Sequence, residues 1–159
     1  MNKEFTGFTP DNHLKHFYMD NNKYYTPSLD EFYVGFEYQK YIPSYKDYVT
    51  ITVNKVDITS IPNYYSSGVD DTCLRIKYLD QEDIESLGWI PGIANIEGKE
   101  IDCYGINNIV ITSITKDHKL DISYISTIGG KSSLQRIFRG VVKNKSELKK
   151  LMKQLGINE

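Results

Sequence analysis

The sequence has little of several features that would identify a class of protein. Its 159 residues include only two cysteines, Cys73 and Cys103, too few for a disulfide framework and not spaced as a CxxC motif. No apolar run approaches the roughly 18 residues of a membrane span, and residues 1–6 are too polar for a signal peptide. We therefore expect both cysteines to be reduced and buried, and the protein to work in the cytoplasm without a membrane partner.

Catalytic and cofactor motifs are also missing. The stretch Gly129-Gly130-Lys131-Ser132 matches the end of a P-loop, but Ile125 stands where the first glycine belongs. A segment predicted as strand also follows where that motif needs a helix, so we interpret the stretch as a hairpin turn. Three histidines lack the further ligands that a metal needs, and we interpret them as surface side chains: His13, His16 and His118. The sequence thus indicates no catalytic residue, metal or cofactor, and we lean towards a protein that is not an enzyme.

The sequence does have enough apolar residues for a core, and its charge is unevenly distributed. Hydrophobic residues make up 40% of the chain, and its length suits one domain. The net charge is −2, yet residues 1–130 carry 11 basic and 19 acidic side chains, whereas residues 131–159 carry 8 basic and 2 acidic ones. A basic end of +6 can meet nucleic acid, an acidic protein partner, or the acidic face of the same chain.

Hydrophobic periodicity predicts an α+β fold built mostly from antiparallel strands. Residues 1–28 show no sustained period and are predicted to form a loosely ordered arm, which leaves 29–159 as a single domain. A short mid-chain helix is expected after Asp80, which can cap it, and Gly88 should end it. Strands are expected in the first half at 32–38, 48–56 and 74–78, with a loop at 59–70.

An antiparallel meander is expected in the C-terminal half. The chain should leave the mid-chain helix in a turn at 89–92 and turn again at 105–108, 116–119 and 129–130. Gly140 within the last strand indicates a bulge or the close approach of another backbone. The strands of the meander are expected at 99–104, 109–115, 120–124 and 134–142.

The strongest local signal is at 144–156. Asn144 and Glu147 have the spacing of a capping box, and Gly156 occupies the position after the helix where glycine is favoured. Apolar residues recur at i, i+3, i+4 and i+7 on one face: Leu148, Leu151, Met152 and Leu155. We predict an amphipathic helix that packs on the sheet and leaves its lysines in solvent.

Two sets of side chains are candidates for a binding surface. The first is basic and could contact phosphates or an acidic partner, although a solvated lysine-rich helix face explains the same pattern: Arg136, Arg139, Lys143, Lys149, Lys150 and Lys153. The second belongs to a region that holds ten of the 13 tyrosines, a residue favoured at protein interfaces: Tyr33, Tyr38, Tyr41 and Tyr45. Strand packing and the codon usage of an AT-rich genome would also explain the tyrosines.

Three stretches carry a resemblance to other proteins: 25–38, which includes Asp30-Glu31-Phe32-Tyr33-Val34-Gly35, then 78–89, and 138–148. They resemble small proteins of unknown function encoded by phages and mobile elements of gut Bacteroidota, crAss-like phages included. The resemblance implies an origin, and a setting in the host cell cytoplasm or a virion, but no catalytic residue.

These observations lead to two hypotheses. The first is a non-enzymatic, phage-encoded accessory protein that binds a protein partner, either a host factor or a phage or virion component. The alternative is a nucleic-acid or nucleotide-ligand binding protein that uses the basic C-terminal strand–helix unit. A second copy of the chain is a further candidate partner, and no cofactor is expected.

Overall fold

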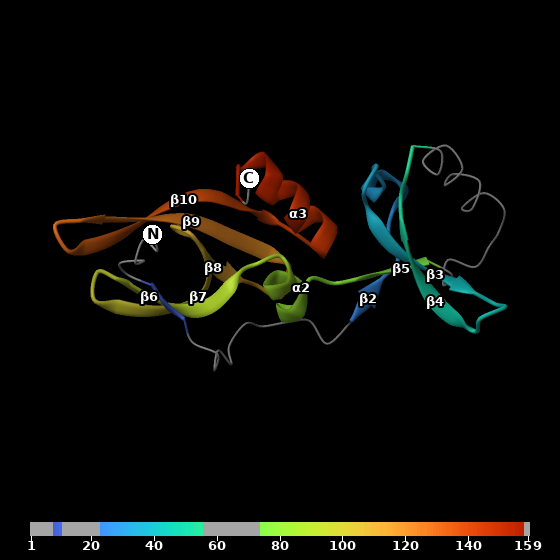
Figure 1. Ribbon diagram of the computed structural model, residues 1–159, viewed down its shortest axis with the longest axis horizontal. Coiled ribbons are helices and arrows are strands. Elements are labelled where there is room, and N and C mark those ends of the chain that lie inside the picture. Colours follow the sequence, from blue (N-terminus) through green and yellow to red (C-terminus); the bar gives the residue numbers. More distant parts are fainter. Residues whose placement is uncertain (1–7, 11–22, 56–73, 158–159) are drawn as a thin grey trace.

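The computed structural model describes residues 8–10, 23–55 and 74–157, and these form two antiparallel sheets with two α-helices (Figure 1). The larger sheet contains β1 (Phe8–Pro10), β6 (Ile90–Ile96), β7 (Lys99–Ile106), β8 (Ile109–Ile114), β9 (Lys119–Ile128) and β10 (Lys131–Val141). The smaller sheet contains β2 (Tyr24–Tyr25), β3 (Glu37–Ile42), β4 (Asp47–Thr52) and β5 (Leu74–Lys77). The helices are α2 (Gln81–Ser86), α3 (Lys145–Gln154) and the short 3₁₀ turn η1 (Leu29–Glu31).

The strand orders confirm the predicted fold class. The larger sheet runs β1-β6-β7-β8-β9-β10, and its last five strands are a meander of consecutive hairpins. The smaller sheet runs β2-β5-β3-β4 and lies beside the larger one along the long axis of the molecule (Figure 1). The fold is therefore α+β and mostly antiparallel, with a short mid-chain helix and a C-terminal helix. Residues 1–28, predicted as an arm, include β1 and β2, each of which pairs in a sheet.

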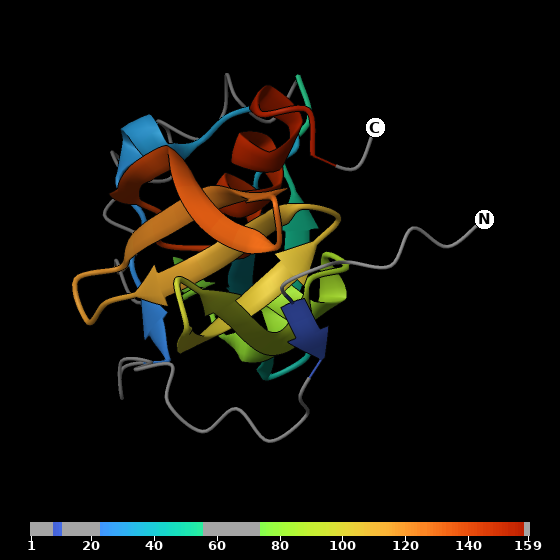
Figure 2. The same ribbon diagram turned by 90° about the vertical axis from the view of Figure 1, so that its left-hand side faces the viewer.

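The larger sheet buries both of its faces. On one face Cys103, Val110 and Ile125 form a cluster that Phe8 of β1 joins. On the other face Tyr104, Leu120 and Ile122 pack against Trp89 and the apolar side of α3. The sheet curls, so that β10 approaches β6 (Figure 2). Because both faces are covered, apolar residues occur at adjacent positions in β7 and β9, which blurs the alternation seen in a half-exposed strand.

The C-terminal helix has the predicted caps. The Asn144 side chain accepts a hydrogen bond from the Glu147 N–H at 3.0 Å. At the other end Gly156 has φ +67, and the N–H groups of Gly156 and Ile157 donate to the carbonyls of Lys153 and Met152, as in a Schellman motif. One detail of the predicted capping box is wrong: the Glu147 carboxylate accepts from the N–H of Lys143, one residue before the cap.

The strand predicted at 32–38 begins later than expected. Tyr33 to Phe36 form a turn closed by the Phe36 N–H and the Tyr33 carbonyl at 3.0 Å, and β3 starts at Glu37. Gly35 has φ +92, a conformation that a β-branched or aromatic residue would adopt only with strain. The turn places Val34 at the surface with 51% of its area exposed.

Several positions in the C-terminal half also differ from the predictions. Residues 90–92, predicted as a turn, begin β6, and Gly105, predicted in a turn, is inside β7. The bulge in β10 lies between Arg136 and Phe138 and not at Gly140. Gly140 instead leaves room for the Phe138 ring, because a Cβ at position 140 would be 2.7 Å from Cζ of Phe138. Gly129 and Gly130 have positive φ and form the expected hairpin turn. The predictions for His13, His16, Cys73 and the loop at 59–70 concern residues outside the described ranges.

Candidate functional site

A groove of about 650 Å³ follows one face of α3 from Ser146 to Ile157. The turn at 33–35 forms its opposite side. Apolar side chains from the 33–35 turn, the end of α2, and α3 with the residues after it line the groove: Val34, Leu87, Met152 and Ile157. Three lysines border it: Lys149, Lys150 and Lys153. We call this feature the α3 groove.

The three lysines of the α3 groove are available to a ligand. Among the residues that the structure describes, no carboxylate lies within ion-pair distance of their ammonium groups. Lys150 instead places its Nζ 4.3 Å from the centre of the Tyr33 ring, a cation–π contact across the groove. Burial, together with the nearby carboxylates of Glu147 and Glu37, raises the pKa of Tyr33 to about 12, so its phenol is neutral at physiological pH. The groove therefore has an apolar floor and a positive border.

The other predicted basic residues are paired with acids of the same chain. Arg136 and Arg139 both approach Asp121, each with Nε 3.4 Å from the same carboxylate oxygen. Lys143 lies 3.4 Å from Glu31. These pairs are partly solvent-exposed and contribute roughly 0–1 kcal/mol each, but they reduce the positive potential at the arginines. The structure thus divides the basic candidates into three residues on the α3 groove and three with internal partners.

The four tyrosine candidates lie in different environments. Tyr33 lines the α3 groove, whereas Tyr38 is 6% exposed and packs in the core of the smaller sheet with Phe36 and Val53. Tyr41 is half-buried and makes an edge contact with Tyr48 across β3 and β4. Tyr45, in the turn that joins those strands, is 73% exposed. Burial removes Tyr38 from contact with a partner of the folded chain, and Tyr33 is the candidate that contacts a lysine of the groove.

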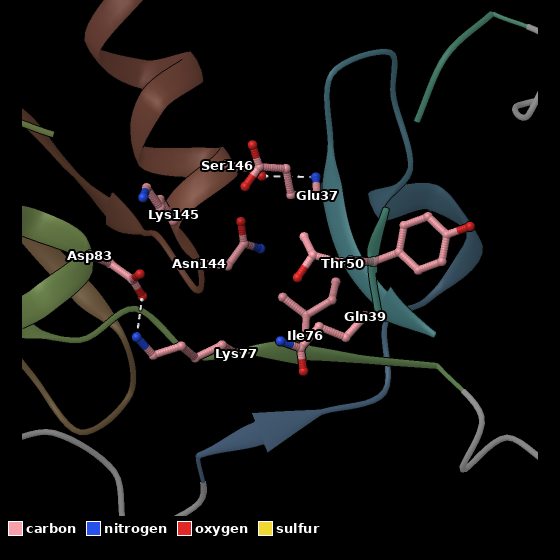
Figure 3. A pocket seen from close by; sticks show the side chains of 10 residues that line it. Glu37, Gln39, Thr50, Ile76, Lys77, Asp83, Asn144, Lys145 and Ser146 are labelled. Atoms are coloured by element: carbon pink, nitrogen blue, oxygen red, sulfur yellow. Dashed lines mark hydrogen bonds and ion pairs between the residues drawn. The ribbon is translucent and has the colours of Figure 1, made fainter. Parts of the chain in front are cut away.

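A second, smaller pocket of about 170 Å³ lies at the junction where the smaller sheet meets Asp83 of α2 and the start of α3 (Figure 3). Two of its charged groups pair with each other, since Lys77 Nζ is 3.3 Å from Asp83, and the same Nζ lies 2.6 Å from Asp80. Burial would lower the pKa of Lys77, but its two aspartate partners outweigh burial and raise it. Asp80 also caps α2 by accepting the Asp83 N–H at 3.0 Å, as predicted. The arrangement is that of a helix cap with its counter-ion, which supports structure at the junction.

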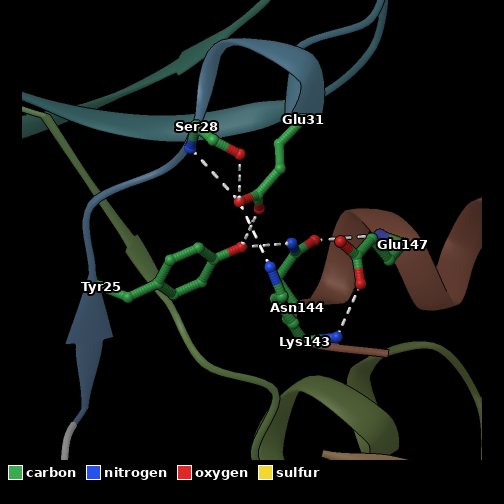
Figure 4. Close-up of polar contacts among 6 residues, drawn as sticks. All are labelled: Tyr25, Ser28, Glu31, Lys143, Asn144 and Glu147. Atoms are coloured by element: carbon green, nitrogen blue, oxygen red, sulfur yellow. Dashed lines mark hydrogen bonds and ion pairs between the residues drawn. The ribbon is translucent and has the colours of Figure 1, made fainter. Parts of the chain in front are cut away.

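A network of polar side chains holds the segment before the 33–35 turn against the start of α3 (Figure 4). The Tyr25 hydroxyl donates to Glu31 at 2.6 Å and accepts from the Asn144 amide at 2.9 Å. Burial is the largest cause that raises the pKa of Glu147, and the nearby Glu31 carboxylate adds to it. Since residues 25–31 lead directly into the turn at 33–35, this network sets the position of one wall of the α3 groove relative to the other.

The remaining candidates for chemistry are structural. Burial raises the pKa of the Cys103 thiol to about 12, so the thiol stays protonated and unreactive. His118, predicted as a solvated surface side chain, is half-buried and stacks on Tyr78 with ring centres 4.2 Å apart. Across the described ranges no group of three or more His, Cys, Asp or Glu side chains could hold a metal ion. The positions of Cys103 and His118 are thus explained by packing within the fold.

Sequence reasoning found the lysines of the α3 groove but missed its floor. Met152 is predicted in the core and lies there, but its place beside a groove is not predicted. Val34 is predicted in a strand and lies on a turn instead. The signal for Val34 was Gly35, whose positive φ turns the chain and leaves the valine at the surface.

Comparisons with protein-family models, curated proteins and solved structures found no match to this chain. Within the described part of the chain, no helix has both the length and the hydropathy needed to cross a bilayer.

Proposed function

We propose that this chain is a non-enzymatic binding protein whose α3 groove takes an acidic segment of a partner protein. One observation carries the proposal: three lysines without acidic partners among the described residues border a groove with an apolar floor. If the resemblance to phage proteins holds, the partner is a host factor or a phage or virion component.

The two parts of the groove would contribute differently to binding. Each exposed lysine–carboxylate pair adds roughly 0.2–1 kcal/mol and mainly speeds association and selects the partner. Each apolar side chain of the partner that becomes fully buried against the floor of the groove adds about 1.5–3 kcal/mol, before the entropy cost of ordering the segment is subtracted. A segment that alternates acidic and apolar residues would use both parts. Val34 already exposes 51% of its area on the turn, and a partner would cover it.

Charge pairing favours a protein partner over nucleic acid. A DNA duplex or single-stranded nucleic acid needs an extended run of positive side chains to contact its phosphates. Here Arg136 and Arg139 share Asp121, and Lys143 pairs with Glu31, so such a run is interrupted. Of the six basic candidates, the three without such partners lie together on α3, beside apolar side chains that phosphates do not need. A short acidic protein segment matches this combination better.

The test is selection of random 12-residue peptides on the immobilised full-length chain. Lys149→Glu/Lys153→Glu reverses two charges of the groove, and Lys99→Glu/Lys131→Glu makes the same charge change on exposed lysines of β7 and β10. A third variant, Val34→Asp, disrupts the apolar side of the groove without touching α3.

We expect selected peptides to be enriched in Asp or Glu together with apolar residues. Binding should fall at least tenfold in the groove variants and stay within about twofold in the Lys99/Lys131 control. No enrichment, or equal loss in both charge-reversal variants, would contradict the proposal. Binding of 20-nucleotide DNA at low salt that is lost with Lys149 and Lys153, without peptide enrichment, would replace it with the nucleic-acid alternative.

A further inference from the structure

A second groove of about 370 Å³ adjoins the α3 groove and has the opposite charge. Three carboxylates line it: Asp30, Glu31 and Glu147. Its apolar lining comes from β10 and from the next face of α3: Phe138, Val141, Val142 and Leu151. We call this feature the acidic groove.

The two grooves share one border. Tyr33 and Lys150 line both of them, and the cation–π contact between these two side chains separates the two spaces. Exposed apolar side chains lie on each side, with Val34 at 51% and Val141 at 52%. A chain that crosses the Tyr33–Lys150 contact would therefore leave a positive surface and enter a negative one without losing apolar contacts.

We infer that the acidic groove is a second subsite for the same partner, and that it takes an apolar and basic part of the segment whose acidic part occupies the α3 groove. This inference rests on the proposed function. It assigns a polarity to the partner: acidic residues at one end, and an apolar residue next to a Lys or Arg at the other.

The charges of the acidic groove are not equally available. Glu31 is held by Tyr25, Ser28 and Lys143, and Glu147 is bonded to the Lys143 N–H. Asp30 is fully exposed, and its hydrogen bond with Ser28 lowers the pKa of its carboxyl, which therefore stays ionised at physiological pH. Asp30 is thus the group that meets a partner's cation, while Glu31 and Glu147 add to the negative potential behind it.

The geometry of α3 sets the spacing between the two parts of the ligand. Lys149 and Lys153 face the α3 groove, whereas Leu151 and Gln154 face the acidic groove, so the two subsites lie on neighbouring sides of one helix. A helix with its side chains is about 10–12 Å across, and an extended chain advances about 3.3 Å per residue. About three residues should therefore link the acidic part to the apolar and basic part.

The test extends an acidic peptide that the α3 groove binds. A three-residue Gly-Ser linker followed by Leu-Lys is added at either end, and a matched peptide carries Leu-Glu instead. Fluorescence anisotropy then measures the Kd of each peptide for the full-length chain, for Asp30→Asn, and for Asp117→Asn, which removes an exposed acid in the turn between β8 and β9.

We expect Leu-Lys at one end to tighten binding about tenfold and Leu-Glu to add much less. About two- to fivefold of the gain should disappear in Asp30→Asn, the range of one exposed ion pair, and remain in Asp117→Asn. If the unextended peptide binds but neither Leu-Lys extension tightens it, the inference is overturned while the proposed function stands. If Leu-Glu helps as much as Leu-Lys, the charge match is refuted. An acidic peptide that does not bind contradicts both proposals.

Discussion

The hydrogen bond between Asn144 and Tyr25 is predicted to join the smaller sheet to the C-terminal helix energetically. Asn144 is 2% exposed, and its side chain makes two bonds: Oδ1 accepts from the Glu147 N–H at 3.0 Å, and Nδ2 donates to the Tyr25 hydroxyl at 2.9 Å. Asn144→Ala removes both. We expect it to lower the free energy of unfolding by about 2 kcal/mol, with the cap and the hydrogen bond each supplying about 1 kcal/mol.

A double-mutant cycle isolates the bond between the two side chains. Tyr25→Phe removes the same bond and also the one to the Glu31 carboxylate, so its own effect should be about 2–3 kcal/mol. Because the Asn144–Tyr25 bond is lost in each single variant, the double variant should be more stable than the sum predicts by about 1 kcal/mol. Asn144→Ser keeps an oxygen for the helix cap and loses the amide donor. It should therefore cost about 1 kcal/mol and show the same coupling.

The assay is urea unfolding of the four proteins of the cycle, followed by the fluorescence of Trp89. This is the single tryptophan of the sequence and is 1% exposed, so unfolding should change its emission. Single and double effects that add within about 0.3 kcal/mol would refute the bond. A cost of Asn144→Ser equal to that of Asn144→Ala would show instead that capping of α3 does not depend on this side chain.

Three further predictions concern stability. Gly140→Ala should lower the free energy of unfolding by about 1–3 kcal/mol, because its Cβ would be 2.7 Å from the Phe138 ring, and Phe138→Leu should reduce that loss in urea titrations. Gly105→Ala should destabilise similarly, because the new Cβ would be 2.9 Å from the ring of Phe8; an unchanged loss in a Phe8→Ala background would contradict docking of β1 there. Burial raises the pKa of Glu147, so the folded state holds its proton more tightly than the unfolded state, and stability from this group falls as pH rises through the folded pKa. The stability of Glu147→Gln relative to the wild type should therefore increase as the pH rises above the ordinary pKa of a glutamate, and a difference independent of pH in urea unfolding would contradict the raised pKa.

Both helices could be predicted because their signals are local. Asp80 and Asn144 each accept an N–H three residues ahead, and Gly88 and Gly156 each adopt the positive φ that ends a helix. Such bonds depend on a few neighbouring residues, so the sequence specifies them without knowledge of the rest of the fold. The hairpin turn at 129–130 could be predicted for the same reason.

Strand β6 could not be predicted because its first residues favour a turn, and pairing with β7 and with the distant β1 decides the outcome. Pro91 and Gly92 are typical of a turn, and only the neighbouring strands override that preference. β1 pairs with residues 92–94 and does not pair with Pro91. The proline has no N–H to donate, but pairing with β1 does not require one at that position. The error at 32–36 has the opposite cause, since a run of aromatic residues outweighed the local signal of Gly35.

The site was only partly predictable because its charges are set by long-range contacts. The sequence shows a C-terminal segment of +6, but the partner of Lys143 is Glu31, 112 residues away, and the partner of both arginines is Asp121 on a neighbouring strand. Those pairings cannot be inferred from spacing. Of the six basic candidates, those without an acidic partner among the described residues are Lys149, Lys150 and Lys153, which lie beside apolar side chains.

Because only three of the basic candidates lack acidic partners among the described residues, the salt dependence of binding should distinguish the two hypotheses for function. If the three lysines of the α3 groove neutralised three phosphates, the logarithm of the binding constant would fall with the logarithm of salt concentration with a slope of about −3. An acidic peptide whose apolar residues cover Val34 has fewer counterions to release, and burial of its apolar groups is weakened little by salt. We therefore expect a slope near −1 for peptide binding to the α3 groove. A slope of −3 or steeper would show that charge alone holds the ligand, and would favour nucleic acid over a protein segment.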